Sequence, residues 1–146
     1  MTPLPIWMRA TLFATAAMNM LGAAAFLPAA QPLRDLGGLP DADHPLYLAT
    51  VGIFIFVLGL GYLGSAVLGR ADRLFIAVGA TGKLAFFALL VGLCAEGQLS
   101  IEAPLAGAGD LLFGILFVVW LLRPRREPVR DRMSEKRDSM STSWFT

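Results

Sequence analysis

The sequence is poor in the residue types on which most protein chemistry depends. Its 146 residues include one cysteine, Cys94, and one histidine, His44. A membrane thiol–disulfide oxidoreductase needs at least a reactive cysteine pair, so this chain alone does not belong to that class. A bis-histidine haem site or a histidine metal cluster is excluded for the same reason, and we expect no metal site.

Motifs of common enzymes and carriers are also missing. The chain has no glycine-rich phosphate loop, no serine-nucleophile elbow and no His-Glu metal motif. Drug/proton antiporters built from four short helices rely on a carboxylate in the first helix, and no acidic residue lies between Arg9 and Arg34. We therefore expect no catalysis by this chain alone, and a role within a larger enzyme is left open.

Charge is scarce in the body of the chain and concentrated at its C-terminus. Only 16% of the residues are charged and 56% are hydrophobic, whereas soluble domains are about a quarter charged. The mean hydropathy is +0.65. Seven of the 12 basic residues follow residue 122. This composition predicts an integral membrane protein, and nothing in it indicates a nucleic-acid partner.

Four long apolar segments predict membrane-spanning helices. Each has the roughly 20 residues that cross ~30 Å of hydrocarbon at about 1.5 Å per residue. The apolar runs are continuous rather than alternating, which disfavours barrel strands. We expect an all-α, integral membrane four-helix bundle within residues 1–122, with helices at about 6–28, 46–69, 74–95 and 104–122.

The first segment also has features of a cleaved signal peptide, with Arg9 before it and the small residues of "LGAAAF" near its end. Its uncharged run is far longer than the roughly 7–15 residues of a signal-peptide core. We therefore expect it to be retained as a helix.

The loops between these segments differ in charge. The first loop, "QPLRDLGGLPDADH", carries three aspartates against one arginine, and the third, "CAEGQLSIEA", carries two glutamates. The second, "GRADR", carries two arginines. The positive-inside rule then predicts an N-in/C-in, multi-pass protein of a bacterial inner (plasma) membrane. Residues 123–146 form a basic, polar tail that we expect to be cytoplasmic and disordered, serving as a stop-transfer signal or binding anionic lipids.

Three polar side chains interrupt the predicted helices: Asn19, Lys83, which lies within "VGATGKLAFFALLVG", and Asp110. Polar and ionisable groups inside a membrane normally face the interior of a bundle, where pairing lowers their cost. The helical rise puts Lys83 and Asp110 about 7 Å apart in depth, comparable to the reach of a lysine. Side chains lean toward their helix N-termini, however, which draws these two apart. A direct ion pair and one mediated by water or by Asn19 are both open.

These three residues have a functional and a structural interpretation. They form either a polar site that binds a ligand headgroup or passes protons, or a neutral pair that fixes the helix register. In the functional interpretation His44 and Tyr47 lie at its outer mouth. Small residues are expected to allow close helix packing within the bundle, or dimerisation in the case of the second helix, and the candidates are Gly61, Ser65, Gly79, Ala106 and Gly114.

Arg9 opens the first helix, that helix is rich in small residues, and "FLP…LRDLGGLP" follows it. In these features the sequence is similar to the DoxX-like group of small four-helix bacterial membrane proteins. The resemblance covers residues 1–122 in outline. It implies a helical-bundle subunit or accessory factor, in some relatives linked to quinone or sulfur redox chemistry. The single cysteine argues against thiol chemistry by this chain alone.

Three functions follow from these observations. The first is a binding or accessory subunit whose buried polar site takes a lipid-like or quinone-like ligand, with membrane lipids as partners and no other cofactor evident. The second is a small transporter or proton-coupled carrier in which Lys83 and Asp110 titrate alternately. The third is a structural partner, either in a homo-oligomer or in a larger membrane complex.

Overall fold

The computed structural model describes residues 2–40 and 44–124, and most of them are helical. The prediction of an all-α fold is therefore confirmed. Most of the predicted tail, residues 125–146, and residues 41–43 of the acidic first loop lie outside the described residues. The helices are α1 (Ile6–Ala25), α2 (Gln31–Leu36), α3 (Pro45–Leu68), α4 (Arg73–Ala95), α5 (Glu102–Ala106) and α6 (Ala108–Leu122).

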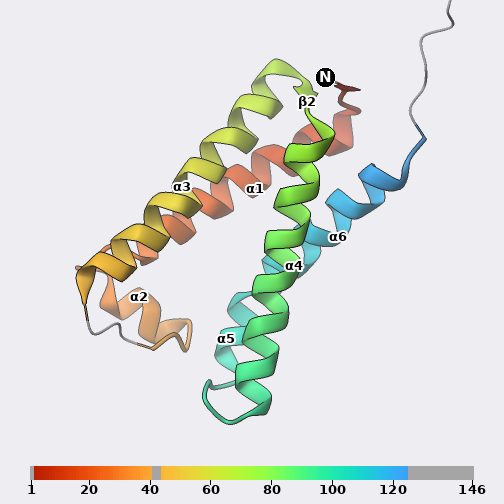
Figure 1. Ribbon diagram of the computed structural model, residues 1–146. Coiled ribbons are helices and arrows are strands. Elements are labelled where there is room, and N and C mark those ends of the chain that lie inside the picture. The colour runs from red at the N-terminus through yellow and green to blue at the C-terminus, as the bar shows by residue number, and fades with distance from the viewer. Residues whose placement is uncertain (1, 41–43, 125–146) are drawn as a thin grey trace, which may run out of the picture.

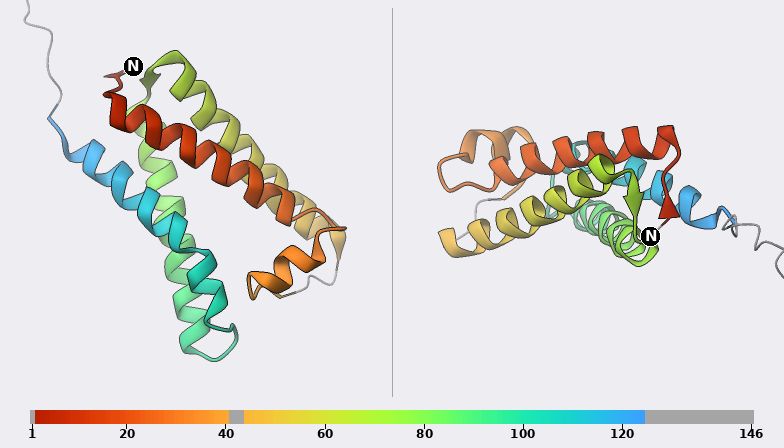
Figure 2. Two further views of the ribbon diagram at one scale, coloured as in Figure 1. Left: turned by 180° about the vertical axis from the view of Figure 1, so that it is seen from behind. Right: turned by 90° about the horizontal axis from the view of Figure 1, so that it is seen from above.

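The long helices form two antiparallel pairs that diverge from one end. Helix α1 packs along α3, and α4 packs along α6, while α1 and α6 form a smaller contact between the pairs. The pairs meet near the N-terminus and separate toward the end that carries α2 and α5, so that they form a V (Figure 1). The view from behind shows the same divergence (Figure 2).

A dense apolar cluster holds the pairs together at their meeting point. Its members come from α1, α3, α4, α6 and the turn before α4, and they are Met8, Leu12, Ala16, Tyr62, Ala66, Ala71, Ile76, Ala80, Phe117 and Trp120. Two short strands add a backbone connection at the same end. Strand β1 (Thr2–Pro3) pairs antiparallel with β2 (Arg70–Ala71) in the turn between α3 and α4, a pairing that hydrophobic periodicity alone does not predict.

The starts of α3 and α4 each have a local cause. Pro45 opens α3, where its missing N–H has no cost, and the Nδ1 atom of His44 accepts a hydrogen bond from the backbone N–H of Leu46 at 3.1 Å. The carboxylate of Asp72 caps α4 by accepting from the backbone N–H groups of Leu74 (2.8 Å) and Phe75 (3.2 Å). These caps start α3 and α4 within one residue of the expected positions.

The segment expected to form one helix over about 104–122 contains a break. Helix α5 ends at Ala106 and α6 starts at Ala108, with Gly107 between them. Two glycines, Gly107 and Gly109, stand in the "AGAG" run at this point and weaken helical continuity. The break makes Asp110 a residue of the first turn of α6 rather than of a helix interior.

Three arginines bind the C-terminal ends of other helices. The guanidinium of Arg9 donates to the carbonyl of Ala66 at 2.7 Å, at the end of α3. Arg34, on α2, is buried and donates to carbonyls at the end of α1, and Arg73, on α4, donates to the carbonyl of Leu121 near the end of α6. Cations favour these positions because the last carbonyls of a helix lack helical donors and lie at its negative end.

Two of the described helices, α3 and α4, are long and apolar enough to cross a membrane. Their most apolar windows have mean hydropathies of 2.2 and 2.1, yet only 22% and 28% of those windows are buried. Helix α6 is apolar but shorter, with 15 residues. The exposed side chains include Ile53, Phe54, Val57, Leu89 and Val91. The low burial distinguishes α3 and α4 from the core helices of a soluble protein and supports membrane insertion.

Candidate functional site

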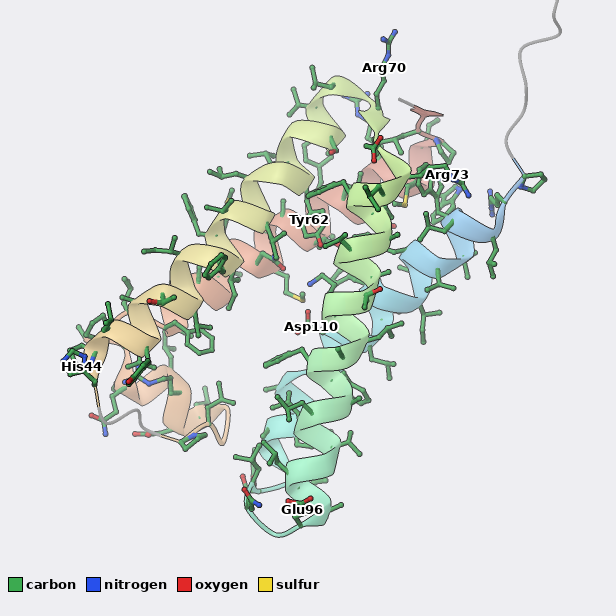
Figure 3. The ribbon with its side chains drawn as sticks, in the orientation of Figure 1. His44, Tyr62, Arg70, Arg73, Glu96 and Asp110 are labelled. Atoms are coloured by element: carbon green, nitrogen blue, oxygen red, sulfur yellow. The ribbon has the colours of Figure 1, made fainter. Side chains whose placement is uncertain are left out.

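Lys83, Asn19 and Asp110 meet where the two helix pairs diverge, and we call them the polar triad. The ammonium group of Lys83 lies 2.6 Å from Oδ1 of Asp110 and 3.0 Å from Oδ1 of Asn19. Lys83 and Asn19 are each 7% exposed, and the Asp110 side chain is 20% exposed. The three residues come from α4, α1 and α6, so the triad joins the two pairs. Figure 3 labels Asp110, which lies in the angle between them.

Of the pairing modes left open by the sequence, the structure shows the direct ion pair, and Asn19 is an additional partner of Lys83 rather than a bridge to Asp110. Lys83 forms a direct ion pair with Asp110 and a second hydrogen bond with Asn19. The ammonium group is thus shielded from apolar surroundings by two oxygens rather than one.

Asn19 is held in place by its amide nitrogen, which donates to the carbonyl of Ile55 on α3 at 3.3 Å. This contact directs the amide oxygen toward Lys83, since the two atoms have opposite hydrogen-bonding roles. Gly59 allows the approach of α1 to α3, because a Cβ at this position would lie 3.2 Å from the Cβ of Asn19.

The break at Gly107 has an electrostatic consequence for Asp110. Residues in the first turn of a helix face unpaired N–H groups and the positive end of the helix dipole, which favours a carboxylate there. Asp110 occupies such a position in α6. The carboxylate therefore has two sources of stabilisation, the Lys83 ammonium and the start of its own helix.

The triad borders a cavity of about 420 Å³ between the two helix pairs. This volume falls within the range of roughly 300–1,000 Å³ that is typical of small-molecule pockets. Most of the lining is apolar and comes from α1 to α5 and the segments between them, including Met18, Phe26, Leu33, Ile55, Phe86, Leu90 and Ala103, while α6 contributes Asp110. Val51 and Leu58 of α3 and Val78 of α4 line the cavity and are 37–57% exposed, so it opens to the surroundings between these two helices.

The loop after α2 crosses from one pair to the other at the wide end of the V. Gly38 has a left-handed backbone (φ 61°), and a Cβ there would lie 2.5 Å from Oγ of Ser100 and 3.2 Å from the backbone nitrogen of Ala103. Gly37 also lies near α5, since its Cβ would be 3.8 Å from that of Ala106. Contact with α5 therefore covers the wide end of the cavity.

Tyr62 belongs to this region and was not among the residues singled out from the sequence. It is 1% exposed, lines the cavity, and its ring centroid lies 5.9 Å from the Lys83 nitrogen, with the ring beneath the triad. The signal that could have found it is a tyrosine in the middle of the apolar, glycine-rich run of α3, whereas the other tyrosine of this helix, Tyr47, stands in its first turn.

His44 and Tyr47 lie away from the triad. Both are exposed near the start of α3, where their rings are 6.2 Å apart, and neither lines the cavity. Figure 3 shows His44 far from Asp110, at the outer end of α3. The structure gives His44 a capping role instead, through its bond to Leu46.

Three of the small residues predicted to pack helices, Gly61, Gly79 and Gly114, lie at contacts between helices. A Cβ on Gly61 would meet Phe75, one on Gly79 would meet Tyr62, and one on Gly114 would meet Leu84. The Ser65 hydroxyl donates to the carbonyl of Gly61 at 2.9 Å, within its own helix. Gly61, Gly79 and Gly114 thus contact neighbouring helices of the same chain.

Comparison of the chain with protein-family models, with curated proteins and with solved structures finds no match. The function must therefore be argued from the cavity and the triad. Among the described residues, no group of three or more His, Cys, Asp or Glu side chains is arranged to hold a metal ion.

Proposed function

We propose that this chain is a small multi-pass protein of a bacterial inner membrane that holds a lipid-like or quinone-like molecule between its two helix pairs. It would act as a binding or accessory subunit, the role that a resemblance to DoxX-like proteins also implies. One observation carries the proposal: a mainly apolar cavity of about 420 Å³ is bordered by a buried lysine with two oxygen partners. An apolar body with one polar group has the shape and chemistry for such a space.

The proposed membrane protein is a four-helix bundle, with α1, α3, α4 and the combined α5–α6 as its spans. The orientation is N-in/C-in. Arg70 and Arg73 lie at the narrow end of the V and Glu96 lies at the wide end (Figure 3). Arg9 contacts the end of α3 and Arg123 contacts Arg73, which places both at the narrow end. The wide end carries Arg34 and Asp35 on α2 and Glu102 on α5 besides Glu96. The positive-inside rule then directs the narrow end to the cytoplasm and the wide end, which the loop after α2 covers, to the outside.

Cysteine labelling tests this orientation. In a Cys94→Ala background, we expect a membrane-impermeant maleimide to label Gln98→Cys in intact spheroplasts and to label Arg70→Cys only after permeabilisation. Both native side chains are exposed, so the two sites are matched in accessibility. Labelling with the opposite pattern would contradict the orientation, and labelling of both sites without permeabilisation would contradict membrane insertion.

Blocking the cavity tests ligand binding. Gly82 lines the cavity, and a Cβ there has no atom within 4 Å, so Gly82→Leu adds a side chain without a backbone clash. We expect lipids or quinones that copurify with the chain, measured by mass spectrometry, to fall by about tenfold because leucine fills the space beside Lys83.

Gly92→Leu is the matched control. Gly92 is on the same helix, is equally exposed and has the same open space at its Cβ, but it does not line the cavity. Copurifying lipid should stay at the level of the unmodified chain. Equal loss in both variants, or loss in neither, would contradict binding in the cavity and leave a structural role as the better interpretation.

The ion pair favours a second candidate, a proton-coupled carrier. Asp110 is partly exposed, and its carboxylate contacts the Lys83 ammonium, so a proton or a cation reaching the cavity has a titratable pair to act on. In that case the unmodified chain would copurify with no lipid and would conduct protons or cations in reconstituted vesicles. Gly82→Leu would abolish that flux.

A further inference from the structure

The triad leaves hydrogen-bonding capacity unused on the side of the cavity. A lysine ammonium has three N–H donors, and Lys83 directs hydrogen bonds to two acceptors among the described residues, Asn19 and Asp110. The Asp110 carboxylate has two oxygens, of which Oδ1 accepts the bond from Lys83. One donor of Lys83 and Oδ2 of Asp110 thus remain for a ligand, and both residues line the cavity.

The net charge of the site is zero. Lys83 and Asp110 are the charged side chains among the described residues that line the cavity, and their charges cancel. Asn19 contributes an oxygen acceptor that carries no charge. A carboxylate at the same place would also bind the ammonium, but the net charge of the site would then be negative. An anionic or cationic ligand would bring an uncompensated charge into this apolar space, which is far more costly than an uncharged polar group that forms a hydrogen bond.

We propose that the cavity selects uncharged lipids that carry a carbonyl or hydroxyl oxygen, and that it rejects lipid anions and lipid cations of the same chain length. The inference rests on the proposed function and names the class of ligand. A carbonyl or hydroxyl oxygen of the ligand accepts a hydrogen bond from the remaining N–H of Lys83. A hydroxyl group can also donate a hydrogen bond to Oδ2 of Asp110. The hydrocarbon chain lies along the apolar lining that α3 and α4 provide.

A competition experiment on the purified full-length chain in nonionic detergent tests the selectivity. Tritium-labelled methyl oleate is bound and then displaced by oleyl alcohol, oleyl sulfate or oleyltrimethylammonium, which share one hydrocarbon chain and differ in charge. The sulfate and the quaternary ammonium keep their charge at any working pH. We expect oleyl alcohol to displace the label at a concentration at least about tenfold lower than either charged lipid.

Asp110→Asn tests whether oleyl sulfate is rejected because of its charge rather than because of the size of its headgroup. This variant leaves the site with a net positive charge while keeping the size of the side chain. The affinity of oleyl sulfate relative to oleyl alcohol should therefore rise by at least about tenfold. Glu96→Gln removes the same charge from an exposed position outside the cavity, and it should leave the ratio unchanged.

Each outcome decides one claim. Equal displacement by the charged and uncharged lipids in the unmodified chain would overturn the selectivity while leaving lipid binding intact. The selectivity would also be overturned if Asp110→Asn folds and changes the affinity of oleyl sulfate relative to oleyl alcohol no more than Glu96→Gln does. If methyl oleate and oleyl alcohol do not bind while a charged lipid does, the inference is wrong and the proposed function stands. If none of these lipids binds the unmodified chain and neither a lipid nor a quinone copurifies with it, both fall.

Discussion

Asp110→Asn and Lys83→Met are each expected to lower the free energy of unfolding by on the order of 3 kcal/mol. Either change leaves one buried charge without its partner, and the remaining charge must then be desolvated without compensation. We place the value at the lower end of the range for buried pairs because Asp110 keeps 20% of its surface exposed. Unfolding of the purified chain in mixed detergent–SDS micelles measures the change.

The double variant, Lys83→Met with Asp110→Asn, should recover to within about 1 kcal/mol of the unmodified chain, because both buried charges are gone. Glu96→Gln serves as the control for loss of an exposed carboxylate, and its effect should be small. Single variants as stable as Glu96→Gln would show that the pair does not shelter the lysine.

The same double variant separates structure from function. It lacks the Lys83 donor and the charge of the Asp110 carboxylate, so a protein that folds normally and no longer retains oleyl alcohol would indicate a binding role. A protein that folds normally and retains the lipid would limit the pair to positioning the helices.

Much of the helical arrangement follows from the sequence because local features determine it. Pro45 and Asp72 each supply an N-terminal signal next to an apolar run, and both α3 and α4 begin there. The high cost of a lysine in an apolar segment predicts a partner for Lys83 and limits the candidates to the other polar groups in the helices. The structure brings two of those groups, Asn19 and Asp110, to its ammonium.

The details of the triad depend on features that a regular helix does not have. In a continuous helix over residues 104–122, the side chain of Asp110 would lean toward the helix N-terminus and away from Lys83. The break at Gly107 restarts the helix just before Asp110, and the weak helix propensity of glycine does not by itself predict where a chain will break.

Other features depend on contacts between distant segments. The strand pair β1–β2 joins residues nearly seventy positions apart and has only two residues in each strand. Tyr62 acquires its place beneath Lys83 from the packing of Phe75 and Phe117 around it, with ring centroids 5.2 and 5.4 Å away. The divergence of the helix pairs, and with it the cavity, is likewise a property of the whole assembly rather than of any one segment.

Gly79→Ala is expected to lower the free energy of unfolding by about 1–3 kcal/mol, although alanine is the better helix former. A Cβ on Gly79 would collide with the Tyr62 hydroxyl group and would lie 3.1 Å from its Cζ atom. The tyrosine cannot move away easily, because it is 1% exposed and held between two phenylalanine rings. Thermal unfolding in detergent, followed by circular dichroism, measures the loss.

Two controls and one rescue define the cause. Gly82→Ala and Gly92→Ala make the same change on the same helix in open space, so each should stabilise the chain by up to about 1 kcal/mol. Tyr62→Phe removes the colliding hydroxyl group, and combining it with Gly79→Ala should restore at least half of the lost stability. A Gly79→Ala variant as stable as the two controls would contradict the close contact between Gly79 on α4 and Tyr62 on α3. The position of Tyr62 depends on that contact, and so does the floor of the cavity beneath Lys83.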